Sequence, residues 1–197
     1  MPEILPDPSR TAVLSMDLQN TIVSIYTKGQ EDFVPRVAST LAAARDHGIK
    51  VIHSQVGFRP GLPEIGARNP LFAGIKNSTQ WQQIFQGTAG AIHPALAPQG
   101  DEIVITKHRI SAFAGTDLEM ILRANEMETL ILMGIATSGV VLATLLQASD
   151  ADYRIVVVKD CCADLDTEVH NCLTGEVFPR LAKVVTADEV IAVLKQK

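Results

Sequence analysis

Short apolar segments alternate with segments of helical periodicity along most of this chain, and no other feature constrains the fold as strongly. The apolar segments are residues 12–16, 49–53, 102–106, 130–133, 154–159 and 184–185. The helical patterns cover residues 33–46, 117–125, 140–151, 167–178 and 187–195. Almost continuously apolar strands are typical of a parallel sheet that is buried on both faces. The alternation therefore predicts an α/β fold with helices on each side of a mostly parallel sheet of about six strands.

Length and charge restrict the function as well as the fold. The chain has 197 residues, which fits a single domain over residues 1–197, and no linker divides it. The net charge of −5 offers no basic surface for nucleic acid, and no apolar run reaches the roughly 18 residues of a membrane span. The amino terminus lacks the basic start and the apolar run of a signal peptide. We therefore expect a cytoplasmic protein that binds neither nucleic acid nor membrane.

Cysteine and histidine residues show neither a disulfide framework nor a metal-binding pattern. The three cysteines, Cys161, Cys162 and Cys172, are too few to staple a chain of this length, and buried packing is the favoured role of Cys162. A zinc site needs three or four ligands, whereas the histidines are scattered and no histidine follows His53 within a dozen residues. We therefore expect no metal and no cofactor.

Charged residues and a glycine-containing turn follow three of the predicted strands. Asp17 follows the first strand, Lys107 the third, and the turn over residues 134–141 the fourth. Ligands of open parallel sheets bind beyond the carboxyl ends of the strands, and the amide groups of a turn that starts a helix favour an anion. We therefore expect Asp17, Lys107 and this turn to converge on one pocket.

Four segments together resemble the isochorismatase-like, or cysteine hydrolase, superfamily, which includes nicotinamidases, N-carbamoylsarcosine amidases and isochorismatases. The segments are residues 13–20, Lys107 with residues 111–116, residues 134–137 and residues 156–163. The resemblance covers most of the chain and implies a three-layer α/β/α sandwich with a Rossmann-like sheet. It also implies that Asp17 and Lys107 match the catalytic Asp and Lys of the amidase members, and that a cis peptide bond joins Ile135 to Ala136.

The catalytic cysteine of the amidase members corresponds to Val140 in this chain. A hydrocarbon side chain cannot form a thioester, so the covalent route of those members is closed here. Isochorismatases of the superfamily also lack the cysteine and use the Asp as a general acid on a vinyl ether. The resemblance thus implies a cysteine-independent hydrolase of a small organic molecule, with Asp17 as general acid or base and Lys107 as its electrostatic partner. Burial would raise the pKa of Asp17 and Lys107 would lower it, and the sequence leaves that balance open.

Two other functions fit the same sequence. Val140 is also compatible with a catalytically inactive binding or regulatory protein that keeps the pocket. A further alternative is an amide hydrolase that uses Ser138 or a bound water. Thr137 and Ser138 are more often helix caps than nucleophiles, which weighs against that alternative.

Substrate contacts are expected from the turn and from the chain that follows the second strand. The turn supplies Ala136, Thr137, Ser138 and Gly139. Gln55 resembles a substrate-binding glutamine of isochorismatases, and Arg59 could pair with a substrate carboxylate; each is weighed equally against an ordinary loop role. Residues 57–100 are too long for a plain loop, so we expect them to carry short helices and to act as a lid that shapes the substrate site.

Oligomer formation is a further expectation. The small residues over positions 142–149 would allow helices of neighbouring subunits to approach closely. Members of the superfamily often form dimers or tetramers, so the resemblance implies a homodimer or a homotetramer.

Overall fold

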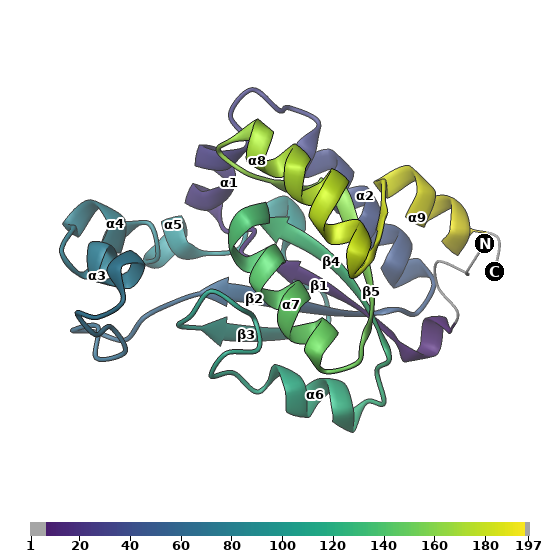
Figure 1. The fold of residues 1–197 in the computed structure, drawn as a ribbon, viewed down its shortest axis with the longest axis horizontal. Coiled ribbons are helices and arrows are strands. Elements are labelled where there is room, and N and C mark those ends of the chain that lie inside the picture. The colour runs from purple at the N-terminus through teal and green to yellow at the C-terminus, as the bar shows by residue number, and fades with distance from the viewer. Residues whose placement is uncertain (1–6, 196–197) are drawn as a thin grey trace.

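A parallel six-stranded sheet forms the centre of the protein (Figure 1). The structure is a computed structural model that describes residues 7–195. The strands are β1 (Thr11–Met16), β2 (Lys50–Val56), β3 (Ile103–Lys107), β4 (Thr129–Ile135), β5 (Arg154–Ala163) and β6 (Lys183–Val185). Their order in the sheet is β3-β2-β1-β4-β5-β6, and every neighbouring pair is parallel. The predicted α/β fold with a parallel sheet is confirmed.

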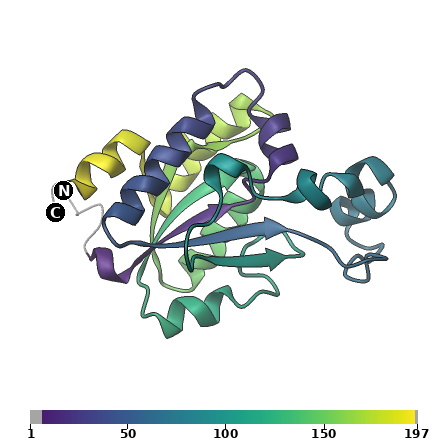
Figure 2. The same cartoon turned by 180° about the vertical axis from the view of Figure 1, so that it is seen from behind.

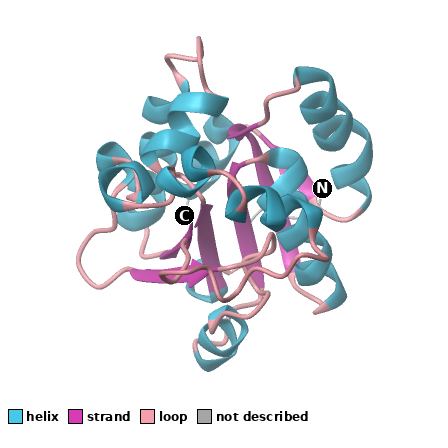
Figure 3. Cartoon of the chain, turned by 90° about the vertical axis from the view of Figure 1, so that its left-hand side faces the viewer, coloured by secondary structure: helices cyan, strands magenta, loops and turns pink. Residues whose placement is uncertain are grey.

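Helices cover both faces of this sheet and complete the three layers. The α-helices of the described chain are α1 (Asn20–Tyr26), α2 (Phe33–Asp46), α3 (Pro70–Lys76), α4 (Thr79–Gln83), α5 (Gly87–Gly90), α6 (Leu118–Ala124), α7 (Leu142–Asp150), α8 (Thr167–Cys172) and α9 (Ala187–Leu194). Of these, α3, α4 and α5 lie beyond the end of the sheet rather than on one of its faces (Figure 1). Side chains alternate between the two faces of a strand. Val13 of β1 therefore packs in a core with α2 and α9, whereas Leu14 packs in a second core with α6 and α7. Figure 2 shows α2 and α9 together on one side of the sheet. Figure 3 shows helices on both sides of the strands.

The predicted elements match the structure in type and order, and they differ at α1, at the ends of β2, β4 and β5, and in the helical segments that begin at residues 137 and 167, the second of which is α-helical only to Cys172. Helix α1 was not predicted, because it is short, rich in β-branched residues and has no side-chain cap; burial of Ile22 and Val23 holds it in place. Strand β5 continues to Ala163, beyond the predicted segment, and its pairing with β4 shifts between Leu132 and Gly134. The predicted helix over residues 140–151 begins as a π-helical turn, Thr137–Val141, that leads into α7.

Residues 57–100 form a small helical layer beyond the carboxyl end of β2, and the expected short helices are present as α3, α4 and α5 (Figure 1). Phe72 and Ile75 of α3 form an apolar cluster of their own with Ile65. Gln19 ties this segment to the sheet, because its side-chain Nε2 donates to the carbonyl oxygens of Val56 at 3.0 Å and Gly90 at 2.6 Å. The segment is therefore packed against the end of the sheet where the site was expected.

The strand register brings the carboxyl ends of the central strands level. Met16, the last residue of β1, lies opposite Ser54 of β2 and opposite Gly134 of β4. Lys107 ends β3 opposite Val56. Any side chain that follows these positions therefore lies at a common edge of the sheet. Within residues 7–195, no helix is long and apolar enough to cross a bilayer.

Candidate active site

Asp17 follows β1 directly and is held by the neighbouring strand. Its backbone φ of 56° turns the chain away from the sheet. The backbone N–H of Asp17 donates to the carbonyl oxygen of Ser54 at 2.8 Å, and the Ser54 hydroxyl donates to Asp17 Oδ1 at 3.2 Å. Two hydrogen bonds from one residue of β2 therefore fix both the backbone and the carboxyl group of Asp17.

Lys107 meets Asp17 at this edge, as the sequence predicts. Its Nζ lies 2.7 Å from Asp17 Oδ2, and only 3% of the Lys107 side chain and 6% of the Asp17 side chain are exposed. The same Nζ donates to the backbone carbonyl oxygen of Arg109 at 3.0 Å. The two charged groups are thus desolvated together, with their hydrogen-bonding capacity directed at each other and at nearby polar groups.

Burial raises the pKa of the Asp17 carboxyl above its ordinary value, because removal from water penalises the ionised form. The positive charge and hydrogen bond of Lys107, and the hydrogen bond from Ser54, oppose this rise without cancelling it. The balance that the sequence left open is decided by depth of burial. Asp17 can therefore hold a proton at a higher pH than an exposed aspartate.

The turn after β4 completes the edge of the site. Gly134 has a φ of +148°, and a Cβ at this position would lie 2.1 Å from the carbonyl oxygen of Met16, so only glycine fits between β4 and β1. The cis peptide bond between Ile135 and Ala136 that the resemblance implies is present. Val140, only 3% exposed, presents its side chain to the site from the same turn.

A cavity of about 440 Å³ opens beside these groups. Its lining residues come from the ends of the strands, from the turn and from the segment over residues 57–100. They are Asp17, Ile22, Tyr26, Val56, Pro70, Leu71, Phe72, Gly74, Ile75, Trp81, Ile84, Phe85, Lys107, Arg109, Ile110, Ile135, Ala136, Gly139 and Val140. The structure thus brings five of the predicted site residues together: Asp17, Lys107, Ala136, Gly139 and Val140.

Thr137 and Ser138 are not among the residues that line the cavity. Both make hydrogen bonds to other parts of the protein instead. The Thr137 hydroxyl lies 2.8 Å from Nδ1 of His170 in α8, and the backbone N–H of Ser138 donates to Asp164 at 2.7 Å. His170 was not predicted near the site, because only the tertiary fold brings α8 beside the turn. These contacts fix the turn from outside, and the His170 ring contacts Thr137 rather than Ser138.

Gln55 and Arg59 also lie away from the lining of this cavity. Gln55 Nε2 donates to the Thr106 hydroxyl at 3.2 Å, across the two strands β2 and β3. Arg59 Nη1 pairs with Glu64 at 2.6 Å, within the same loop. Glu64 follows Arg59 by only five residues, so the sequence contained a signal for this pair. The pair holds the Arg59 guanidinium outside the site.

Arg109 and Tyr26 also line the cavity, although the sequence analysis did not predict them as site residues. The Arg109 guanidinium stacks on Phe72, with Cζ 5.5 Å from the ring centroid, and its Nη2 donates to the Glu64 carbonyl oxygen at 3.0 Å. Tyr26 comes from α1, the helix that was not predicted. Arg109 is therefore the arginine that the fold directs to the cavity, in the place expected for Arg59.

The cysteines lie elsewhere. Cys161 and Cys162 are buried within β5, and the Cys162 thiol donates to the Val158 carbonyl oxygen at 3.4 Å. Burial raises the pKa of Cys161 to about 12 and also raises that of Cys162, so both stay protonated thiols. Cys172 is exposed on α8. None of these three residues lines the cavity.

His53 lies in the middle of β2 and has a structural role. Its Nε2 lies 3.0 Å from Glu102 Oε2, and the guanidinium of Arg45 binds the same carboxylate at 2.7 and 2.8 Å. These contacts lower the pKa of Glu102 to about 2 against the opposing effect of burial. No group of three or more His, Cys, Asp or Glu residues with metal-binding geometry occurs in the described part of the chain.

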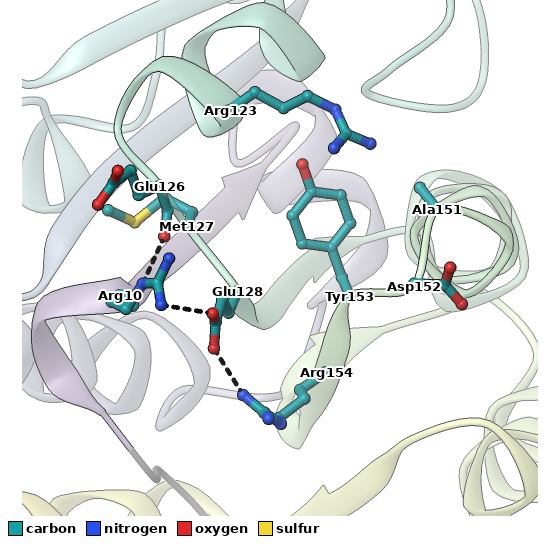
Figure 4. Close-up of a pocket in the computed structure, with 9 residues that line it drawn as sticks. All are labelled: Arg10, Arg123, Glu126, Met127, Glu128, Ala151, Asp152, Tyr153 and Arg154. Atoms are coloured by element: carbon teal, nitrogen blue, oxygen red, sulfur yellow. Dashed lines mark hydrogen bonds and ion pairs between the residues drawn. The ribbon is translucent and has the colours of Figure 1, made fainter.

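A second cavity, of about 570 Å³, lies at the opposite end of the sheet (Figure 4). Its arginines are already paired: Glu128 binds Arg10 at 2.6 Å and Arg154 at 2.8 Å, as the dashed lines show. This cavity lies where β4 and β5 begin, away from the carboxyl ends at which parallel sheets bind ligands. The cavity beside Asp17 is therefore the candidate active site.

Comparisons with known proteins point to one family. The model of the isochorismatase domain matches residues 11–189. The chain is similar to a maleamate amidohydrolase of Pseudomonas putida, with 28% identity over 87% of this chain and 78% of the relative. It is also similar to an uncharacterised isochorismatase family protein of Escherichia coli O157:H7, with 30% identity over 93% and 96%.

Solved structures extend the similarity to the whole fold. An isochorismatase family protein of Burkholderia thailandensis superposes with a TM-score of 0.81 at 30% identity, covering 95% of this chain and 96% of the other. A cysteine hydrolase of Pseudomonas syringae superposes with a TM-score of 0.84 at 25% identity, covering 96% and 94%.

Proposed function

The chain belongs to the isochorismatase family, and from this premise we propose that it hydrolyses a small organic molecule without a cysteine nucleophile. Asp17 is the general acid or base and Lys107 its electrostatic partner. One observation carries the proposal: a buried carboxyl with a raised pKa stands beside Lys107 in a cavity whose turn presents Val140. The site has a proton-transfer group and a charge partner, whereas none of the three cysteines lines the cavity.

Cleavage of a vinyl ether illustrates how these groups would act. The carboxyl proton of Asp17 adds to the terminal carbon of the double bond, whose electron pair forms the new C–H bond. Water attacks the resulting oxocarbenium ion and loses a proton to the Asp17 carboxylate. The hemiketal then breaks its C–O bond and releases an alcohol and a ketone. Lys107 stabilises the Asp17 carboxylate between the transfer of its proton to the substrate and the return of a proton from water.

Amide hydrolysis would use Asp17 in the opposite protonation state. The carboxylate would take a proton from water as the water attacks the amide carbonyl carbon, and the protonated Asp17 would then deliver that proton to the leaving nitrogen. Curated relatives include a maleamate amidohydrolase, ureidoacrylate amidohydrolases and an N-carbamoylsarcosine amidase, all named for amide-type substrates. The test therefore has to include substrates for vinyl-ether cleavage and for amide hydrolysis.

The test is turnover by the purified chain of a panel that contains isochorismate, maleamate, ureidoacrylate and N-carbamoylsarcosine. We expect hydrolysis of at least one member or a close analogue, with loss of activity in Asp17→Asn. An absence of turnover across the panel and its analogues, together with measurable binding, would support a non-catalytic binding protein instead.

A cysteine at position 140 is expected to create amidase activity. Val140→Cys places a thiol on the cavity side of the turn, within a site that already holds a proton acceptor, so we expect an increase of about tenfold or more in amide hydrolysis. The measurement is initial rate on the amides of the panel. Val141→Cys is the matched control, because Val141 is buried in the same turn and does not line the cavity. If Val140→Cys reacts with iodoacetamide yet hydrolyses no amide, the site is not arranged for acyl transfer.

The pH dependence of turnover should identify the role of Asp17. Because its pKa is raised, Asp17 stays protonated above the pH at which an exposed aspartate ionises. A general acid then gives a kcat/KM that is constant below this pKa and falls about tenfold per pH unit above it, because kcat/KM reports the pKa of the free enzyme. A general base gives the opposite slope, with kcat/KM rising through the same pKa. A profile that is flat through the acidic range would contradict both roles.

We also propose that residues 57–100 shape the substrate site as a lid within a single domain, and that the chain forms a homodimer or a homotetramer. The first proposal is supported by the eight lining residues from Pro70 to Phe85. Light scattering of the purified chain measures the second.

A further inference from the structure

The wall that residues 57–100 contribute to the cavity is almost entirely hydrocarbon. Its side chains are those of Pro70, Leu71, Phe72, Ile75, Trp81, Ile84 and Phe85. Across the whole described lining, the polar side-chain groups are those of Asp17, Tyr26, Lys107 and Arg109 and the indole N–H of Trp81. We infer that the site takes a substrate with an apolar hydrocarbon body, at least the size of a ring, that lies against this wall; the inference rests on the proposed function for the reacting end.

The wall is supported from behind, so it presents a fixed surface. Phe58 stands behind it and makes edge-to-face contacts with Phe72, at 6.2 Å between ring centroids, and with Phe85, at 5.5 Å. Phe72 and Ile75 are buried in the same cluster with Ile65. Helices α3 and α4 therefore do not need to rearrange to offer an apolar face to a ligand.

Large hydrophobic side chains at the mouth remain open to water. Leu71 is 59% exposed and Trp81 is 48% exposed, although both line the cavity. A cluster of exposed apolar groups at the rim of a concave site is typical of a ligand-binding surface. An apolar ligand body would remove this area from water, which is favourable in proportion to the area buried.

The polar groups are too few and too occupied to serve a polar substrate body. Asp17 and Lys107 bind each other at 2.7 Å, and the Arg109 guanidinium donates to two backbone carbonyl oxygens while stacking on Phe72. Hydroxyl or amide groups laid along the wall would lose their water without gaining partners there. The site therefore favours a molecule with its polar, reacting group at one end only.

The binding test uses Trp81, the single tryptophan of the chain, as the reporter. The full-length protein is titrated with phenylacetamide and with malonamide, which replaces the ring by a second amide group. Tryptophan fluorescence and calorimetry are both recorded. We expect a Kd for phenylacetamide at least about tenfold lower, equivalent to about 1.4 kcal/mol. Equal binding, or tighter binding of malonamide, would overturn the inference.

A matched pair of variants locates the site. Leu71→Asn should weaken phenylacetamide binding about tenfold, whereas Met120→Asn should leave it unchanged, because Met120 is 68% exposed on α6 and does not line the cavity. Equal effects of the two variants would overturn the assignment to this wall. The readout needs no turnover, so a chain that prefers the apolar probe but hydrolyses nothing supports this inference while contradicting the hydrolytic function.

Discussion

Replacing Asp17 by Asn should abolish hydrolysis and also weaken the fold. A positioned acid or base contributes about 10²–10⁴ in rate, so kcat should fall by that factor. The substitution also leaves the Lys107 ammonium, which is 3% exposed, without its carboxylate. Breaking one partner of a buried pair costs about 3–5 kcal/mol. The measurements are kcat on the substrate found in the panel and the free energy of unfolding in urea.

Two controls separate catalysis from stability. The double variant Asp17→Asn, Lys107→Met removes the unpaired charge, so it should regain much of the lost unfolding free energy while remaining inactive. Glu119→Gln breaks the exposed pair with Arg123 and should cost well under about 1 kcal/mol. If Asp17→Asn keeps full activity, Asp17 is not the proton-transfer group. If the double variant is no more stable than Asp17→Asn, the cost does not come from the unpaired lysine.

Gly134→Ala should destabilise the protein strongly, and Gly134 is the only glycine within the described strands. A Cβ there meets the Met16 carbonyl oxygen at 2.1 Å and the Met16 carbonyl carbon at 2.9 Å, both backbone atoms. Met16 cannot move aside easily, because β1 is paired on both sides. We expect a loss of about 3–5 kcal/mol in the free energy of unfolding, the range of severe steric substitutions.

The matched substitution is Gly175→Ala, where no atom lies within 4 Å of the added Cβ. Alanine favours helical backbone over glycine, so this variant should equal the parent or exceed it slightly in stability. Urea unfolding followed by circular dichroism measures both. A Gly134→Ala protein within about 1 kcal/mol of the parent would show that β4 can shift relative to β1, and that the closeness of the two strands is not required.

The sequence predicts the parts of the site that follow strands directly. Asp17 and Lys107 each come at the end of a buried apolar run, and the carboxyl ends of parallel strands share one edge, so their meeting follows from strand order alone. The turn after β4 is predicted for the same reason. Residues further from a strand end are not constrained in this way. Arg59 lies in a loop and turns to Glu64, while Arg109 turns to the cavity.

The sequence also could not predict which residues of the turn line the cavity and which contact other parts of the protein. Val140 and Gly139 line the cavity, whereas Thr137 contacts His170 and Ser138 binds Asp164 on the other side. A π-helical turn rotates its side chains differently from the α-helix that periodicity suggested. The segment that supplies His170 lies more than thirty residues along the chain, so only packing could bring it beside the turn.

The sequence by itself determined the α/β fold and the edge at which Asp17, Lys107 and the turn gather, because apolar periodicity and strand ends are local properties of the chain. Tertiary structure alone decided the raised pKa of Asp17, the arginine that reaches the cavity and the hydrocarbon character of its wall. These depend on depth of burial and on which distant segments pack together. Depth of burial and the packing of distant segments are properties of the whole fold, so they cannot be predicted from any one segment of the chain.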